Sequence, residues 1–144
     1  MSKYDETMKR IENILGAEFE GGFEDALPVL CEYLQKNLQF PFEVKGIEDF
    51  GWEEPYVIGD WDADEYKQLK KTQPSYSDKY DLLSVDADSY SEWLLLSEDL
   101  IANVKRKSDK KKFKLGLAEL KATDKKSQNY QLLDDYAVWF VNSR

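Results

Sequence analysis

Histidine is missing from all 144 residues, and cysteine occurs once, at Cys31. The absence of histidine excludes Ser-His and Cys-His nucleophile pairs, imidazole acid-base catalysis and histidine zinc sites. The sequence also contains neither a G-x-x-x-x-G-K-[ST] loop nor a G-x-G-x-x-G loop that would cradle a phosphate. A glycosidase that works with two carboxylates is the enzyme class left open. We therefore expect a protein that binds a ligand and is not an enzyme.

Long apolar runs are missing too. The longest, such as Trp93 to Leu96, cover a few residues, whereas a membrane-spanning helix needs about 18 or more. The N-terminus, Met1-Ser-Lys-Tyr-Asp-Glu, lacks the basic and apolar regions of an export signal. A single cysteine cannot form an internal disulfide, which agrees with a reducing compartment. These absences predict a cytoplasmic protein with no membrane partner, in which Cys31 packs as a small apolar side chain.

Basic residues are few, because 20 Lys and Arg face 29 Asp and Glu, which leaves a net charge of −9. Nucleic acids are bound chiefly by Lys and Arg on their phosphates, so the sequence argues against a nucleic-acid partner. Residues 43–99 carry 16 acids and 5 bases, whereas residues 100–144 carry 5 acids and 11 bases. The acidic middle suits cations or a basic protein partner; alternatively, it pairs with the basic C-terminal third.

Apolar residues make up 42% of the chain and aromatics 14%, enough to build a core in one domain spanning residues 1–144. An apolar stripe at helical spacing predicts a short helix within residues 1–20, with Ser2 and Asp5 as its capping pair and Gly16 at its end. A second stripe predicts a helix that begins after Asp25 as its cap, has Pro28 in its first turn, and continues to residue 38.

Beyond the second helix the pattern changes to short extended runs. Phe40 to Val44 opens this part, and Tyr56 to Ile58 is expected as a further short strand. The polar stretch that follows, through Pro74, is expected to be a long loop or a loop with a helical turn. Later runs predict strands at residues 80–85, 92–96, 100–105, 112–117 and 136–141, with Ser108-Asp-Lys-Lys as a hairpin turn. The predicted fold class is α+β: two N-terminal helices packed on a small antiparallel sheet or SH3-like barrel.

Carboxylates cluster at several places in the acidic middle. Asp60-Trp-Asp-Ala-Asp-Glu has the D-x-D-x-D opening of an EF-hand, but Glu65 stands where the loop needs glycine and Lys71 where it needs glutamate. The other acidic clusters are Asp86, Asp88 and Glu92, then Glu98 with Asp99, and Asp134 with Asp135. Without histidine, a metal site would be built from oxygen alone, which favours Ca²⁺ over zinc, copper or iron. Each cluster can also be explained as a helix cap, a turn or a partner for lysine.

Two stretches resemble the small calcium-binding proteins of the cyanobacterial CcbP type. They are Leu27 to Glu43, a helix that runs into F-P-F-E, and Asn129 to Phe140, with N-Y-x-L-x-D-D-Y-x-x-W-F, and the similarity covers about residues 25–142. The resemblance implies an acidic calcium binder without EF-hands that buffers or senses intracellular calcium. By this analogy the site positions are Glu43, the pair Asp134 and Asp135, and the pair Glu98 and Asp99. The acidic loop between Trp52 and Tyr80 is longer here, and residues 1–20 are an addition to the shared region.

The leading hypothesis is therefore a bacterial, non-EF-hand calcium-binding protein that uses clustered surface carboxylates. Its predicted ligands are drawn from Glu43, Asp86, Asp88, Glu98, Asp99, Asp134 and Asp135. The alternative is an acidic interaction module, such as an inhibitor, adaptor or immunity-type protein, that binds a basic partner without metal. The two hypotheses differ in whether complex formation needs calcium.

Overall fold

The computed structural model describes residues 2–59, 61–87, 91–96 and 98–144. Its elements follow the chain in this order: α1 (Lys3–Leu15), α2 (Phe23–Asn37), β1 (Phe42–Gly46), η1 (Gly51–Glu53), α3 (Glu54–Val57), α4 (Ala63–Leu69), β2 (Tyr80–Asp86), β3 (Ile101–Arg106), β4 (Lys112–Gly116), η2 (Leu117–Glu119), β5 (Leu120–Ala122) and α5 (Gln128–Ser143). The α+β class is confirmed. The strands form an antiparallel sheet in the order β4-β3-β2-β1-β5. Of the two predicted alternatives, a small sheet or an SH3-like barrel, the structure shows the sheet.

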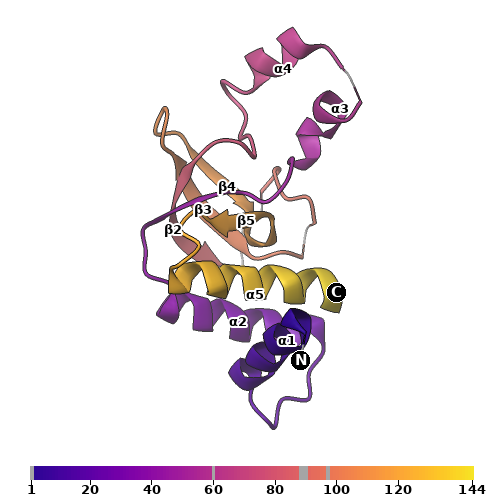
Figure 1. The fold of residues 1–144 in the computed structure, drawn as a ribbon, viewed down its shortest axis with the longest axis vertical. Coiled ribbons are helices and arrows are strands. Elements are labelled where there is room, and N and C mark those ends of the chain that lie inside the picture. Colours follow the sequence, from indigo (N-terminus) through magenta and orange to yellow (C-terminus); the bar gives the residue numbers. More distant parts are fainter. Residues whose placement is uncertain (1, 60, 88–90, 97) are drawn as a thin grey trace.

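Three helices cover one side of the sheet (Figure 1). Helices α2 and α5 lie against the strands, and α1 packs on their outer side. Buried Leu30 and Leu34 of α2 join Leu133, Tyr136 and other residues of α5 in one core with the inward side chains of the strands. Within the part of the chain that is described, no helix is long and apolar enough to cross a bilayer.

The predicted start and end of α1 are confirmed, whereas the predicted start of α2 is wrong. In α1, Ser2 and Asp5 form the expected capping box, and Gly16 ends the helix with a φ of 96° that suits glycine. Helix α2 begins at Phe23, earlier than predicted, with Gly22 at the cap and the Asp25 side chain accepting the Gly22 N–H. Pro28, predicted in the first turn, therefore lies inside the helix.

The predicted strand at residues 136–141 is wrong, because these residues belong to α5. Ser127 caps this helix by accepting the Tyr130 N–H, and a 16-residue amphipathic segment follows. The β-branched and aromatic content of Tyr136 to Val141 favours a strand locally, but burial of Tyr136 and Phe140 against the sheet fixes the helix. The sheet is thus covered directly by one N-terminal helix, α2, and one C-terminal helix, α5. The other N-terminal helix, α1, packs outside them.

Two other strand predictions are wrong, and one strand was missed. Tyr56 to Ile58 does not form a strand: α3 covers Glu54–Val57 with Pro55 in its first turn, where a proline favours helix initiation. The described residues of the 92–96 run are turns and bends, and β5 was not predicted at all. The strands at 80–85, 100–105 and 112–117 are confirmed as β2, β3 and β4, and the hairpin pairs Val104 with Phe113 as expected.

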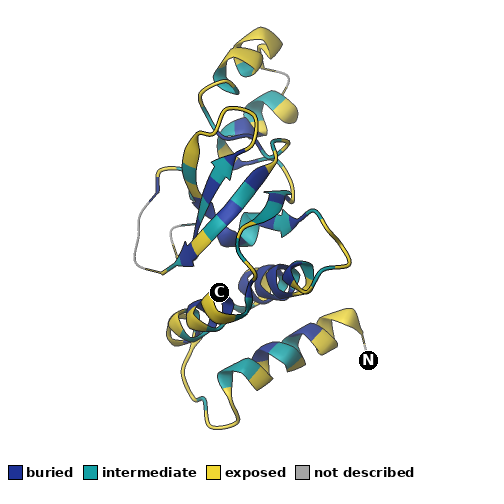
Figure 2. Cartoon of the chain, turned by 90° about the vertical axis from the view of Figure 1, so that its left-hand side faces the viewer, coloured by how far each residue is buried: buried dark blue, intermediate teal, exposed yellow. Residues whose placement is uncertain are grey.

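Residues 51–73, called the arm below, stand apart from the body of the molecule between β1 and β2. Figures 1 and 2 show α3 and α4 at the end opposite α1, with mostly exposed residues at the tip. The expected long polar loop here contains a helix, because Asp62 caps α4 by accepting the N–H groups of Asp64 and Glu65. The acids that resembled an EF-hand opening therefore act as a helix start; Asp60 lies outside the described residues.

Candidate cation site

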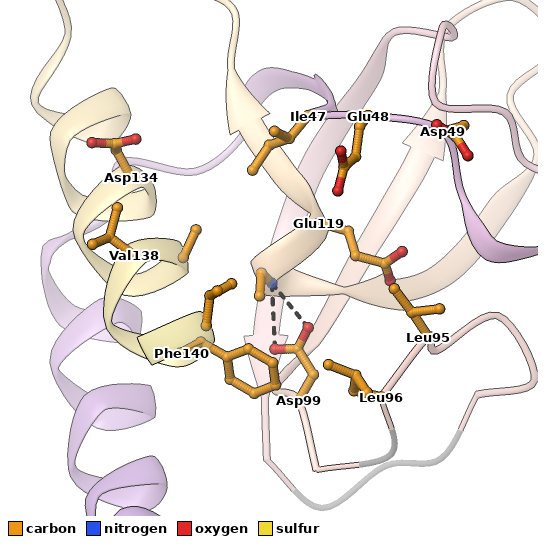
Figure 3. Close-up of a pocket in the computed structure, with 13 residues that line it drawn as sticks. Ile47, Glu48, Asp49, Leu95, Leu96, Asp99, Glu119, Asp134, Val138 and Phe140 are labelled. Atoms are coloured by element: carbon orange, nitrogen blue, oxygen red, sulfur yellow. Dashed lines mark hydrogen bonds between the residues drawn. The ribbon is translucent and has the colours of Figure 1, made fainter. Parts of the chain in front are cut away.

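A cavity of about 340 Å³ opens where the residues after β1, the loop before β3, the turn η2 and the last turns of α5 meet. Its walls are largely apolar, and the exposed side chains of Ile47, Leu95 and Val141 surround its mouth. Two carboxylates, Asp99 and Glu119, stand among these apolar walls (Figure 3). Negative charge in such surroundings is poorly solvated, which makes this cavity a candidate functional site.

Asp99 is 7% exposed and is held in place by two partners. The backbone N–H of Ala118 donates to Oδ2 at 3.0 Å, and the Tyr136 hydroxyl donates to Oδ1 at 2.6 Å. Burial raises the pKa of Asp99 to about 7, more than these hydrogen bonds lower it, and the charge of Glu98 raises it further. Near neutral pH, this carboxyl group therefore exchanges a proton.

Glu119 is half-buried at the end of η2, where the backbones of Leu95 and Gly116 hydrogen-bond its carboxylate. Burial again raises the pKa of Glu119, to about 7, and the nearby charges of Asp99 and Glu48 add to the effect. The Glu48 side chain hangs from the segment after β1 toward Glu119 (Figure 3). Three carboxylates from three separate segments thus share one electrostatic environment.

Gly116 lets the two buried carboxylates approach each other. A Cβ at this position would lie 2.6 Å from Asp99 Oδ2 and 2.7 Å from Glu119 Oε2, so any larger residue would push one of them away. The φ of Gly116 is −71°, which every residue adopts, so glycine serves here for space and not for backbone freedom. The two carboxylate oxygens therefore meet beside a residue without a side chain.

No positive side chain neutralises this pair among the described residues. The lining of the cavity includes no Lys or Arg, and neither Asp99 nor Glu119 takes part in a salt bridge within the residues that are placed. Chemically, such a pair can bind a cation through hard oxygen donors or hold protons at neutral pH.

Sequence reasoning included Asp99 but missed Glu119. Glu119 is a single acid within Leu117-Ala-Glu-Leu, and no spacing rule connects it to a residue 20 positions earlier. Asp134, also predicted, lines the same cavity from α5, but its carboxylate points away from Asp99 and lies 3.5 Å from the Lys3 ammonium group. Of the predicted residues that lie in the described ranges, the structure thus brings Asp99 and Asp134 to one cavity.

The other residues suggested by the resemblance have structural partners elsewhere. The pKa of Glu43 is lowered by a hydrogen bond from the Thr123 hydroxyl, and Lys107 lies 3.7 Å away. Asp135 is buried and accepts two hydrogen bonds from Arg10, which joins α5 to α1.

The remaining predicted acids are also separated. Glu98 lies 3.8 Å from the Arg144 guanidinium, and Asp86 accepts a hydrogen bond from the Asn103 amide across the β2–β3 pair. Asp88 lies outside the described residues. The expected surface cluster of these acids is therefore not assembled in the part of the structure that can be described.

The donor chemistry at the cavity fits calcium better than it fits a transition metal, because every donor is an oxygen. Within residues 2–59, 61–87, 91–96 and 98–144, however, no three Asp, Glu or Cys side chains are grouped closely enough to hold one ion. Asp99 and Glu119 would supply two carboxylate donors to an ion in this cavity, and water or backbone oxygens would have to complete the shell.

Comparison with known proteins finds no matching family model and no similar curated protein. Two solved structures do match over nearly the whole chain. The crystal structure of Anabaena CcbP aligns with 97% of this chain and 93% of its own length, at a TM-score of 0.59 and 16% identity.

The chain has the fold of CcbP.

A second solved structure, described as a calcium-binding protein in the calcium-binding form, aligns with 98% of this chain and 96% of its own length, at a TM-score of 0.58 and 16% identity. The resemblance stated from the two sequence stretches is thus confirmed as similarity to CcbP in fold. The alignment also extends beyond residues 25–142, since it includes nearly the whole chain.

Proposed function

We propose that this protein binds Ca²⁺ in the cavity between η2, the loop before β3 and α5, with Asp99 and Glu119 as its carboxylate ligands. The observation that carries the proposal is the meeting of these two carboxylates beside Gly116 with no basic side chain among the described lining residues. The second structural neighbour, described as a calcium-binding protein in the calcium-binding form, supports the same ligand class.

Electrostatics supply the binding energy. Two carboxylates in apolar surroundings repel each other, and a divalent cation removes both that repulsion and the cost of desolvating the charges. Glu48 is a third acid near the proposed ion, because its exposed side chain extends toward Glu119 and its charge acts on that carboxylate. With two fixed ligands and the rest of the shell from water or backbone, we expect a dissociation constant of about 0.1 to 1 mM.

The role that follows is a calcium buffer or sensor and not a catalyst. Calcium tolerates an irregular shell of six to eight oxygens, whereas Mg²⁺ requires strict octahedral geometry. Binding would also hold together the loop that carries Asp99 and the turn that carries Glu119, and so stabilise the native state by an amount that grows with the logarithm of the calcium concentration above the dissociation constant.

Calorimetric titration of chelator-treated protein with CaCl₂, and with MgCl₂ as the control ion, tests the proposal. We expect one saturable site for calcium and at least about tenfold weaker binding of magnesium. Asp99→Asn or Glu119→Gln should abolish the signal. The matched controls Glu43→Gln and Asp86→Asn also remove one carboxylate each, but at positions that do not line the cavity, and should leave the signal intact. Loss of binding in the control variants and not in the cavity variants would place the ion elsewhere.

A further inference from the structure

The tip of the arm exposes large apolar side chains in the most acidic part of the sequence. Of the seven large apolar residues that are exposed among the described ones, three lie within five positions: Val57 at 41%, Ile58 at 69% and Trp61 at 59%. Single exposed apolar residues need no explanation, but three at one protruding tip indicate a contact surface. Figure 2 shows that this tip stands clear of the sheet and the three helices.

A small aromatic cluster inside the arm supports the tip. The rings of Tyr56 and Tyr66 stack at 5.2 Å between centroids, and the Trp52 ring packs edge-on against both. Trp61 meets Tyr56 edge-on at 5.7 Å and leaves the rest of its indole in solvent. The arm therefore has its own packing, which orients the exposed indole.

Buried charges fasten both ends of the arm to the body. At one end Glu53 is fully buried and accepts hydrogen bonds from the Tyr66 and Ser75 hydroxyls and the Tyr76 N–H. At the other end Arg106, 2% exposed, donates to the backbone carbonyls of residues 70, 71 and 73 and pairs with Asp78 and Asp109. A surface loop that only connects two strands does not need such anchors; they keep the tip in one conformation, which reduces the entropy lost when a partner binds.

The charge around the tip determines which kind of partner fits. Residues 46–66 contain eight acids and no base, and Glu54, Asp64 and Glu65 are exposed beside the apolar residues. Such a surface repels acidic proteins, nucleic acids and anionic lipid, and it attracts Lys and Arg. Its apolar residues would in turn meet an apolar face of the same partner.

We infer that the arm is a docking surface for a basic amphipathic segment of another protein, which packs apolar side chains on Val57, Ile58 and Trp61 and pairs Lys or Arg with the surrounding acids. The binding needs no metal, since the arm and the cation site share no residue. The inference thus stands apart from the calcium proposal.

Fluorescence anisotropy with labelled synthetic peptides tests the inference, with the full chain in physiological salt and chelator. The first peptide is an amphipathic helix former with Lys and Arg on one face and Leu on the other. A second peptide has Ser in place of Leu, and a third has Glu in place of Lys and Arg. We expect binding of the first peptide at micromolar concentrations and at least tenfold weaker binding of the other two.

Two pairs of variants then locate the contact. Ile58→Ser combined with Trp61→Ser should weaken binding of the first peptide about tenfold or more, whereas Val141→Ser, an equally exposed site on α5, should not change it. Glu54→Lys with Asp64→Lys should have a similar effect. Glu12→Lys with Glu20→Lys makes the same change in net charge at the opposite end of the molecule and should change the affinity less than about twofold, because salt screens charges beyond about 8 Å.

Several outcomes would overturn the inference. No binding of the first peptide at millimolar concentration would do so, as would equal binding of the Ser peptide. Equal weakening by the arm pair and by the Glu12 and Glu20 pair would show attraction to net charge alone. Asp99→Asn should leave peptide binding unchanged, so failure of the calcium proposal and failure of this inference are separate results.

Discussion

Asp99 and Glu119 show how two ordinary carboxylates acquire unusual properties through their surroundings. Each has backbone hydrogen bonds that favour the charged form, yet burial outweighs them and brings the pKa of both groups to about 7. An acid that retains its proton up to neutral pH is a poor ligand below that pH and a good one above it. In the proposed site, the two residues would therefore determine both where the cation binds and at which pH it binds.

Calcium affinity should consequently depend steeply on pH in the neutral range. Between pH 8 and pH 6 both carboxyl groups take up protons that calcium must displace, so the affinity should fall by roughly 100-fold. Calorimetry at pH 8, 7 and 6 measures this directly. Ligands at the protein surface, with carboxyl groups of ordinary pKa, would give nearly constant affinity over the same range.

Replacing Asp99 by Asn should make the calcium-free protein more stable at pH 8 while abolishing calcium binding. The amide oxygen of Asn can still accept from the Tyr136 hydroxyl and the Ala118 N–H, and the buried negative charge is removed. The gain in the free energy of unfolding should be about 2 kcal/mol, which is part of the cost implied by the raised pKa. Urea denaturation at pH 8 and pH 5 measures it, and the gain should shrink at pH 5, where Asp99 is already neutral. A loss of stability at pH 8 would contradict the assignment.

Gly116→Ala tests whether the two carboxylates need to meet. The added methyl would lie within 2.7 Å of an oxygen of each, so one side chain must move and calcium affinity should fall about tenfold or more. Gly22→Ala is the control, because nothing lies within 4 Å of the corresponding methyl. Unchanged calcium binding in Gly116→Ala would show that the ion does not sit between Asp99 and Glu119.

Among the elements, the arm depends most on a single side chain from outside it. Arg106 on β3 contacts carbonyls of the 70–73 segment through its guanidinium, and its pair with Asp109 lowers the pKa of that carboxyl to about 2. Lysine cannot reproduce this, because its single ammonium group lacks the planar fork of five N–H donors.

Arg106→Lys should therefore destabilise the protein by about 2 to 3 kcal/mol and loosen the arm more than the helices. Hydrogen exchange should show faster opening of residues 63–69 of α4, with α2 and α5 less affected. Lys112→Arg, at an exposed position on β4, is the matched control and should leave both stability and exchange unchanged. Equal acceleration in α4 and α5 would show a global loss of stability without a special role in the arm.

For the molecule as a whole, the raised pKa values predict an inverted dependence of stability on pH. Asp99 and Glu119 bind protons more tightly in the native state than in the unfolded chain, so in chelator the free energy of unfolding should decrease as pH rises from 5 to 7 and level off above pH 7. Thermal unfolding in saturating calcium should remove this trend, because calcium binds the charged form and displaces the protons. A stability that rises steadily from pH 5 to pH 8 in chelator would disagree with both assignments.

Much of the α+β architecture was readable from the sequence because it rests on local signals. The capping box of Ser2 and Asp5, the stop at Gly16 and the hairpin between Val104 and Phe113 each involve residues close in the chain, where spacing determines the interaction. The wrong strand predictions at Tyr56 to Ile58 and at Tyr136 to Val141 both relied on local strand propensity. Aromatic and β-branched residues favour strands locally, but tertiary burial and proline placement selected helices.

The sequence by itself determined the chemistry that is possible: no histidine, an excess of acid, oxygen as the donor atom and calcium as the matching ion. Only the tertiary structure decided which acids meet. Glu43, Glu98 and Asp135 have basic partners, whereas Asp99 has none among the described residues and lies beside Glu119 at Gly116, although no spacing in the chain connects them. The reason is physical: the charge and donor type belong to each residue, but desolvation and mutual approach depend on what the fold packs around it.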